Sequence, residues 1–341
     1  MNALDIYTHI LPDGFLDVLG RVASGRINIG KRLASVAALV DLDRRFRDMD
    51  AGGPGYRQVI SLPNPPLEEI LPADAAAELA RAGNDGLAAL CARHPDRFPA
   101  FVATVSLLEP EGAVREAGRA IRDLGARGVQ IFTNVAGKPL DRPEYAPLFA
   151  AMEAHGLPVF LHPTRSSAMP DYADEPRSRY EMWWCFGWPY ETSVAVSRLV
   201  LTGLLDRHPG LNLITHHGGG MIPFFDGRVG PGMAVLGSRT AEEDLSGVLP
   251  ALKRPHLDYF RDVWADTAMF GSGTGLPTVL RFYGASRIVF ATDAPFGPIR
   301  PTLDALGALD LTPEERHAVM AGNAERLLRL NGAAAEAGGT A

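Results

Sequence analysis

Eight short apolar runs recur along the chain, and most of them are separated by segments with helical periodicity. The runs cover residues 4–9, 58–62, 100–105, 128–132, 158–162, 212–217, 263–267 and 287–293. The helical segments cover residues 74–93, 111–124, 143–154, 191–207 and 275–283. Strands that alternate with helices predict a parallel sheet. Eight such units predict an α/β fold of the closed (β/α)8 type, the TIM barrel. The rival is an open doubly wound sheet, which would be favoured by a Gly-x-Gly-x-x-Gly turn after the first strand. No such turn is present.

Length and charge narrow the class of protein further. With 341 residues, the chain fits one barrel domain over residues 1–330, followed by an Ala/Gly-rich segment, 331–341, that we expect to be a flexible tail. The net charge of -7 argues against a nucleic-acid partner. No run approaches the ~18 apolar residues of a membrane span. The N-terminus lacks the pattern of a signal peptide. Only Cys91 and Cys185 are present, which favours a reducing, cytoplasmic location.

Three segments are longer than a minimal barrel requires. They cover residues 12–49, 163–189 and 228–257, and we expect a helix in the second half of the last one. Long loops after barrel strands usually build the active site, so we expect these loops to form a lid. The second segment contains Trp183, Trp184 and Trp188, which either pack as a surface patch or cover the substrate.

Polar side chains stand at the ends of the predicted strands. They are Tyr7, His9, His162, His216, His217 and Asp293. Because the C-terminal ends of barrel strands meet on one face, imidazoles, a carboxylate and a phenol should converge there. Such a set suits a divalent transition metal with an open coordination position.

Strand alternation decides which of these side chains should point into the barrel. Tyr7 and His9 are two residues apart, so both can point inward. His216 and His217 are adjacent, so only one should enter the site, and we expect His216 to point outward or to stand behind the ligands. Three glycines follow His217 and let the backbone approach a ligand closely. Asp266 ends the seventh strand, either as a partner of a ligand or simply as a strand terminus.

Five motifs in this order resemble the amidohydrolase superfamily, and specifically its amidohydrolase-2 branch, which includes aminocarboxymuconate-semialdehyde decarboxylase. The motifs are Asp5-x-x-x-His9-Ile-Leu-Pro12, Phe160-Leu-His-Pro163, Gly187-Trp-Pro-x-Glu-Thr-Ser193, His217-Gly-Gly-Gly-x-x-Pro-Phe224 with Gly227-Arg228, and Thr292-Asp293. The resemblance extends from residue 4 to about residue 330. It implies a barrel that holds one divalent metal, with His9, His162 and Asp293 as ligands. It also implies His217 as an acid/base group acting with Asp293, and Arg228 as a substrate-carboxylate ligand.

The first strand departs from the family pattern. Members of the family carry His-x-His or Glu-x-His there, whereas this chain has Tyr7-Thr8-His9. A free tyrosine has a pKa of about 10, so coordination as phenolate needs a strongly Lewis-acidic metal or a nearby cation. Two interpretations stay open: Tyr7 is a metal ligand, or it fills the position that a ligand has left. We expect zinc first, with manganese or iron as alternatives.

The resemblance favours nonoxidative decarboxylation of a small unsaturated or aromatic carboxylate. Arg228 offers a planar fork for a carboxylate, and Trp184 offers a flat apolar wall. Arg228 is alternatively a structural ion-pair residue. The metal ligands, His217 and Arg228 also suit hydrolysis of an amide or lactone by hydroxide held on the metal.

A third class of function is a partner-dependent or non-catalytic subunit of a hetero-oligomer, including one with iron-based oxygenase chemistry. We expect a homodimer, with a hetero-oligomer as the alternative.

Overall fold

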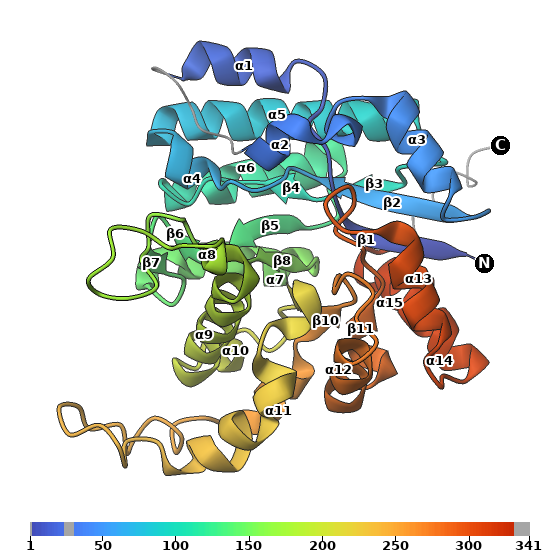
Figure 1. The fold of residues 1–341 in the computed structure, drawn as a ribbon. Coiled ribbons are helices and arrows are strands. Elements are labelled where there is room, and N and C mark those ends of the chain that lie inside the picture. The colour runs from blue at the N-terminus through green and yellow to red at the C-terminus, as the bar shows by residue number, and fades with distance from the viewer. Residues whose placement is uncertain (1, 24–30, 331–341) are drawn as a thin grey trace.

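The computed structural model describes residues 2–23 and 31–330. The expected tail, 331–341, lies outside the described residues. Eight strand positions follow one another around the molecule (Figure 1). They are β1 (Ala3–His9), β2 (Tyr56–Ser61), β3 (Ala100–Phe101) with β4 (Ala103–Thr104), β5 (Val129–Phe132), β8 (Val159–His162), β9 (Leu213–Thr215), β10 (Trp264–Asp266) and β11 (Ile288–Val289). Neighbouring strands pair in parallel.

Backbone hydrogen bonds close the strands into a barrel. The N–H of Ile6 donates to the carbonyl of Phe290 at 3.0 Å, and that of His9 to Ala294 at 2.8 Å, which joins β1 to the segment around β11. On the other side, β3 and β4 are separated only by Val102, so one strand joins the β1–β2–β3 sheet to the β4–β11 sheet. The predicted (β/α)8 barrel is confirmed.

Helices surround the strands, and the five segments with helical periodicity are helical, whereas the three described helices that follow β11 were not predicted. They are α5 (Ala73–Arg93), α6 (Pro110–Leu124), α7 (Ala146–His155), α9 (Gly187–Leu201), α10 (Leu204–Arg207), α12 (Gly275–Tyr283), α13 (Ile299–Gly307), α14 (Pro313–His317) and α15 (Asn323–Leu327). Local sequence sets their ends: α6 begins at a proline and ends at Gly125, which has φ +78° and suits the left-handed C-terminal turn. None of the described helices has the length and apolar character needed to cross a bilayer.

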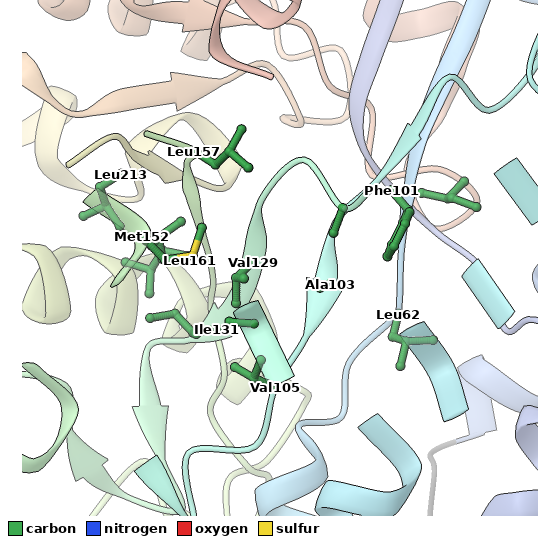
Figure 2. Close-up of a cluster of buried hydrophobic side chains, with 14 of the residues drawn as sticks. Leu62, Phe101, Ala103, Val105, Val129, Ile131, Met152, Leu157, Leu161 and Leu213 are labelled. Atoms are coloured by element: carbon green, nitrogen blue, oxygen red, sulfur yellow. The ribbon is translucent and has the colours of Figure 1, made fainter. Parts of the chain in front are cut away.

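Alternation along each strand separates the barrel interior from the helix-facing layer. In β8, Val159 and Leu161 belong to the main apolar core, whereas Phe160 belongs to a second core with Leu4 and Ile214. Figure 2 shows Leu161 beside Leu213, Met152 and Leu157 in that main core. Because residues two apart share a face, His162 follows Phe160 toward the interior.

The long connections differ in structure. The connection over residues 12–49 contains α1 (Phe15–Val22), α2 (Lys31–Ser35) and α3 (Leu42–Asp50). The connection over residues 163–189 contains α8 (Met182–Cys185). The third long connection, over residues 228–257, extends away from the barrel at the lower left of Figure 1. It begins with a π-helical turn, Arg228–Gly232, and the 3-10 turn Met233–Val235.

The expected helix in the second half of this third segment is wrong. Residues 236–255 are described and contain no helix, and α11 (His256–Asp262) begins only at the end of the segment. Pro250 and Pro255 interrupt the stretch, and a proline removes the N–H that a continuing helix needs.

Candidate metal centre

Four side chains converge at the C-terminal end of the barrel: His9, His162, His216 and Asp293. Each offers one ligand atom, and these atoms all lie within 4.8 Å of one another. Asp293 Oδ1 lies 3.1 Å from His9 Nε2 and 3.5 Å from His216 Nε2. All four residues are buried. The structure therefore brings together the three predicted ligands and adds His216.

The tautomers of two of the candidate ligand histidines follow from their neighbours. His9 Nδ1 lies 3.1 Å from the carbonyl oxygen of Leu62, and His162 Nδ1 lies 2.7 Å from that of Pro163. Because a carbonyl oxygen only accepts, each Nδ1 carries the proton and donates it. Each Nε2 then presents its lone pair to the cluster, as in metal-binding histidines.

The donor set fits a divalent cation. His9 Nε2 and His216 Nε2 are buried, and within the described chain neither makes a hydrogen bond of good geometry despite the nearby Asp293. Buried polar atoms without partners are rare and costly. A cation held between the two imidazoles, His162 and the carboxylate would satisfy them, and three nitrogens with one oxygen form a common zinc or manganese environment.

The charges of the cluster support the same assignment. Burial raises the pKa of Asp293, but the neighbouring His216 and His9 lower it more, so the carboxyl pKa lies well below its usual value. Burial, helped by His216, holds the pKa of His162 well below its ordinary value. Burial lowers the pKa of His216, but the carboxylate of Asp266 outweighs it and raises that pKa to about 9. A cation and a proton therefore compete for His216 Nε2.

The expectation that His216 points outward or stands behind the ligands is wrong, because its ring belongs to the four-residue cluster itself. β9 ends at Thr215, so strand alternation no longer governs the next two residues. His217 has a positive φ of 54°, and its ring stacks on that of His216 at a centroid distance of 3.7 Å. Both histidines therefore stay on the mouth side. His216 Nδ1 is hydrogen-bonded to Asp266, which makes Asp266 the partner of a candidate ligand.

His217 stands next to the cluster without belonging to it. Its Nδ1 donates to the carbonyl of Ala268 at 2.7 Å, so Nε2 is the nitrogen with a lone pair. Burial, together with the charge on His216, lowers the pKa of His217 to about 4. A bound cation would act in the same direction. At neutral pH the ring is therefore an uncharged proton acceptor, as an acid/base role requires.

The phenol of Tyr7 lies among the ligand rings. Its centroid is 4.0 Å from that of His216 and 5.8 Å from that of His162. The hydroxyl is buried and has no hydrogen-bond partner among the residues described. Burial, with the carboxylates of Asp266 and Asp293, raises the pKa of Tyr7 well above its ordinary value. These surroundings favour the protonated phenol, whereas coordination would need the phenolate.

The tryptophan closest to the ligands is Trp188. Its ring lies 5.5 Å from that of His162 and is stacked at 6.2 Å on that of His217. Trp184, which the sequence analysis proposed as a substrate wall, lies farther from the histidines than Trp188. Its side chain is 39% exposed, and its ring centroid is 6.4 Å from that of Trp188. The signal for Trp188 was present in the Gly187-Trp-Pro motif.

Arg228 stands at the start of the π-helical turn that opens the third long connection. Its side chain is exposed, and the described chain offers it no carboxylate within salt-bridge distance. The first long connection carries three further basic residues between positions 26 and 32: Arg26 and the side chain of Arg32 lie outside the described part of the chain, and Lys31 is exposed at the start of α2.

Comparison with known proteins identifies the family. A sequence profile described as Amidohydrolase matches residues 34–330. The chain belongs to the amidohydrolase family.

Three relatives place it within that family. Gamma-resorcylate decarboxylase from Rhizobium sp. (strain MTP-10005) is 34% identical over 310 residues, covering 86% of this chain and 89% of the relative. The 2-amino-3-carboxymuconate-6-semialdehyde decarboxylase of Dictyostelium discoideum is 27% identical over 347 residues, covering 96% and 92%. A dihydroxybenzoic acid decarboxylase from Polaromonas sp. JS666, solved with manganese and the inhibitor 2-nitroresorcinol, is 28% identical with a TM-score of 0.78, covering 97% and 98%. The prediction of an amidohydrolase-2 enzyme of the decarboxylase type is confirmed.

Proposed function

We propose that this amidohydrolase family member catalyses the nonoxidative decarboxylation of a small aromatic carboxylate. The observation that carries the proposal is the convergence of three imidazoles and Asp293 beside the uncharged ring of His217. The names of two relatives give resorcylate and 2-amino-3-carboxymuconate-6-semialdehyde as the compounds that they decarboxylate. A flat unsaturated acid also suits the ring of Trp188 next to the cluster.

One divalent ion held by His9, His162, His216 and Asp293 would polarise the oxygen atoms of the substrate as a Lewis acid. The nitrogen-rich donor set favours zinc, whereas a relative was solved with manganese. We therefore propose zinc or manganese, with Tyr7 as a neutral neighbour in the position that the family gives to a further ligand.

His217 is the proposed proton carrier. Being neutral at pH 7, it first accepts a proton, from solvent or from a hydroxyl of the substrate, on Nε2. It then gives that proton to the ring carbon that bears the carboxylate, so a C–H bond forms. The carbon–carbon bond to the carboxylate then breaks, its electron pair stays in the ring, and CO2 leaves. No oxidant is needed. Asp293, ionised at neutral pH, stabilises the protonated imidazole.

The groups that hold the substrate are part of the same proposal. Arg228 binds the carboxylate of the substrate as a bidentate partner. Trp184 and Trp188 form an apolar wall, and residues 163–189, which carry them, act as a lid.

Cys91 and Cys185 are free thiols, which agrees with a proposed cytoplasmic location. Exposed aromatic side chains at Phe186 and Tyr190 support a homodimer.

The decisive experiment combines metal analysis with product analysis. Protein expressed with added zinc or manganese should hold about one ion per chain and should release CO2 from hydroxybenzoates, with the decarboxylated phenol detected by chromatography. A chelator and His217→Asn should each abolish the release. Turnover of lactones or amides without turnover of the acids would replace the decarboxylase proposal with the hydrolase. Absence of bound metal would favour a non-catalytic subunit, and bound iron with oxygen consumption would favour an oxygenase.

A further inference from the structure

A pocket lies outside the metal centre, between α3 and the start of α13 (Figure 1). None of the four cluster residues lines it. Its wall includes Arg45, Asp48, Gln58, Pro295, Ile299 and Arg300. The space open to the centre of a water molecule is about 250 Å³. Since one water needs about 10–15 Å³ on this measure, the pocket is large enough for a small ligand.

Arg45 is the buried charge in this wall, with an exposed fraction of 2%. Its Nε donates to Gln58 Oε1 at 2.9 Å, and its Nη2 donates to Thr8 Oγ1 at 3.0 Å. Its Nη1 donates to the carbonyls of His9 and Ala38, at 2.5 Å and 3.4 Å. All of these acceptors are uncharged, so within the described chain the guanidinium has no carboxylate partner.

The guanidinium of Arg45 therefore lacks two things within the part of the chain that the structure describes. A buried charge normally has a partner of opposite sign, because a lone charge in the interior is costly. Each Nη also carries two N–H groups, and on Nη2 only the one that donates to Thr8 has an acceptor. An anion in the pocket that Arg45 lines would supply both the missing acceptor and the missing charge.

The rest of the wall also favours a negative ligand. Arg300 lies at the exposed rim, and its ion pair with Asp304, at 2.9 Å, is a surface pair of little energy. Asp48 is the opposing charge in the wall, but both of its oxygens accept from Nε of Arg44, at 3.0 Å and 3.1 Å. The first turn of α13, which contributes Ile299, carries no acidic side chain, so the positive end of its dipole adds to the attraction for an anion.

The pocket is connected to two of the candidate metal ligands through the backbone. Arg45 holds the carbonyl of His9, and the N–H of His9 donates to the carbonyl of Ala294 at 2.8 Å. Ala294 and Gly297 line the pocket, and the N–H of Gly297 donates to the carbonyl of Asp293 at 2.9 Å. A ligand in the pocket therefore contacts the side chain and the loop that hold His9 and Asp293 in place.

We propose that this pocket binds a small oxyanion, a phosphate or a carboxylate, and that the bound anion slows release of the metal. Arg45 binds the anion from the inner wall, and Arg300 binds it from the rim. Because the coupling between two binding sites is reciprocal, an anion that fixes the backbone around His9 and Asp293 strengthens the hold on the metal. The proposal is independent of the decarboxylase activity, since the pocket is separate from the cluster.

The test measures anion binding to the metal-loaded protein by calorimetry, with inorganic phosphate and acetate as the probes. At least one of them should bind saturably to the wild type, and the tighter one shows which kind of oxyanion the pocket prefers. The rate at which the metal passes to an excess of chelator is then measured with and without that anion. The anion should slow this transfer severalfold.

Two variants assign these effects to the pocket. Ala51→Trp fills the pocket from an exposed part of its wall, and Arg300→Met removes the cation of the rim. Ala51→Trp should abolish the slowing of metal release, and Arg300→Met should weaken anion binding about tenfold, as expected for one charged hydrogen bond. Arg47→Met is the matched control, because Arg47 is an exposed arginine of α3 that does not line the pocket. It should retain both effects.

Each other outcome contradicts a stated part of the proposal. Equal anion binding in the wild type, Ala51→Trp and Arg300→Met would place the anion elsewhere, including on the metal, and would overturn the site. Absence of saturable binding of either anion would overturn it too. Binding that both variants weaken, with metal release unchanged, would overturn the coupling. None of these results touches the decarboxylase, because CO2 release is measured without added anion.

Melting temperatures in the absence of anion show whether the variants are folded. Arg300 lies on the surface, so Arg300→Met tests the site even where Ala51→Trp does not fold.

Discussion

The carboxylate of Asp266 on β10 accepts a hydrogen bond from Nδ1 of His216, which directly follows the neighbouring strand β9. The other oxygen of the same carboxylate is held by the backbone N–H groups of Gly218 and Ala268, at 3.2 Å and 3.1 Å. Asp266 therefore fixes the ring of His216 and keeps its proton on Nδ1, which leaves Nε2 for a metal.

We expect Asp266→Asn to weaken metal binding about 10- to 100-fold when it is measured above about pH 9, where no proton competes with the metal for His216 Nε2. The amide retains the size of the carboxylate, but it removes the negative charge that makes the imidazole a better ligand. Competition with a chromophoric chelator measures the affinity. Asp262→Asn is the control, since Asp262 pairs with Arg254 near the surface. An unchanged metal affinity in Asp266→Asn would show that His216 does not bind the metal.

Metal binding should release a proton. The pKa of His216 is raised to about 9 in the metal-free cluster, so at pH 7 its Nε2 carries a proton that the cation must displace. Affinity should therefore rise with pH, by at most about tenfold per pH unit, and level off above about pH 9. Asp293 releases no proton on metal binding in this pH range, because its carboxyl pKa lies far below the range. Calorimetry in buffers of different ionisation enthalpy counts the protons, and His216→Asn should release fewer.

Most of the barrel and three of the four candidate ligands could be predicted from the sequence, because these features depend on local patterns. Apolar runs marked the strands, and His9, His162 and Asp293 stand at their ends. His216 could not be placed, because strand alternation holds only while the strand continues, and the positive φ of His217 leaves no sign in a single sequence. The position of Trp184 depends on how a long loop packs, which periodicity does not describe.

Replacing Tyr7 by phenylalanine tests whether the phenol holds the metal. We expect Tyr7→Phe to bind nearly as much metal as the wild type, because the buried hydroxyl is held in its protonated form. Its melting temperature should stay close to that of the wild type, since the hydroxyl has no hydrogen-bond partner within the described residues. Elemental analysis and absorption spectra provide the readouts. Loss of metal from a folded Tyr7→Phe protein, together with loss of a charge-transfer band, would make Tyr7 a ligand.

Arg228 provides the test of substrate charge. Aromatic acids should bind to the metal-loaded protein about 10- to 100-fold more tightly than their methyl esters, because the loss of one charged hydrogen-bond partner costs about 1.5–3 kcal/mol. Arg228→Met should reduce this difference by lowering the affinity for the acid and leaving that for the ester nearly unchanged. Arg239→Met is the control, since Arg239 is another exposed arginine of the same long connection. Equal affinity of the wild type for acid and ester would remove the carboxylate-binding role and favour the hydrolase over the decarboxylase.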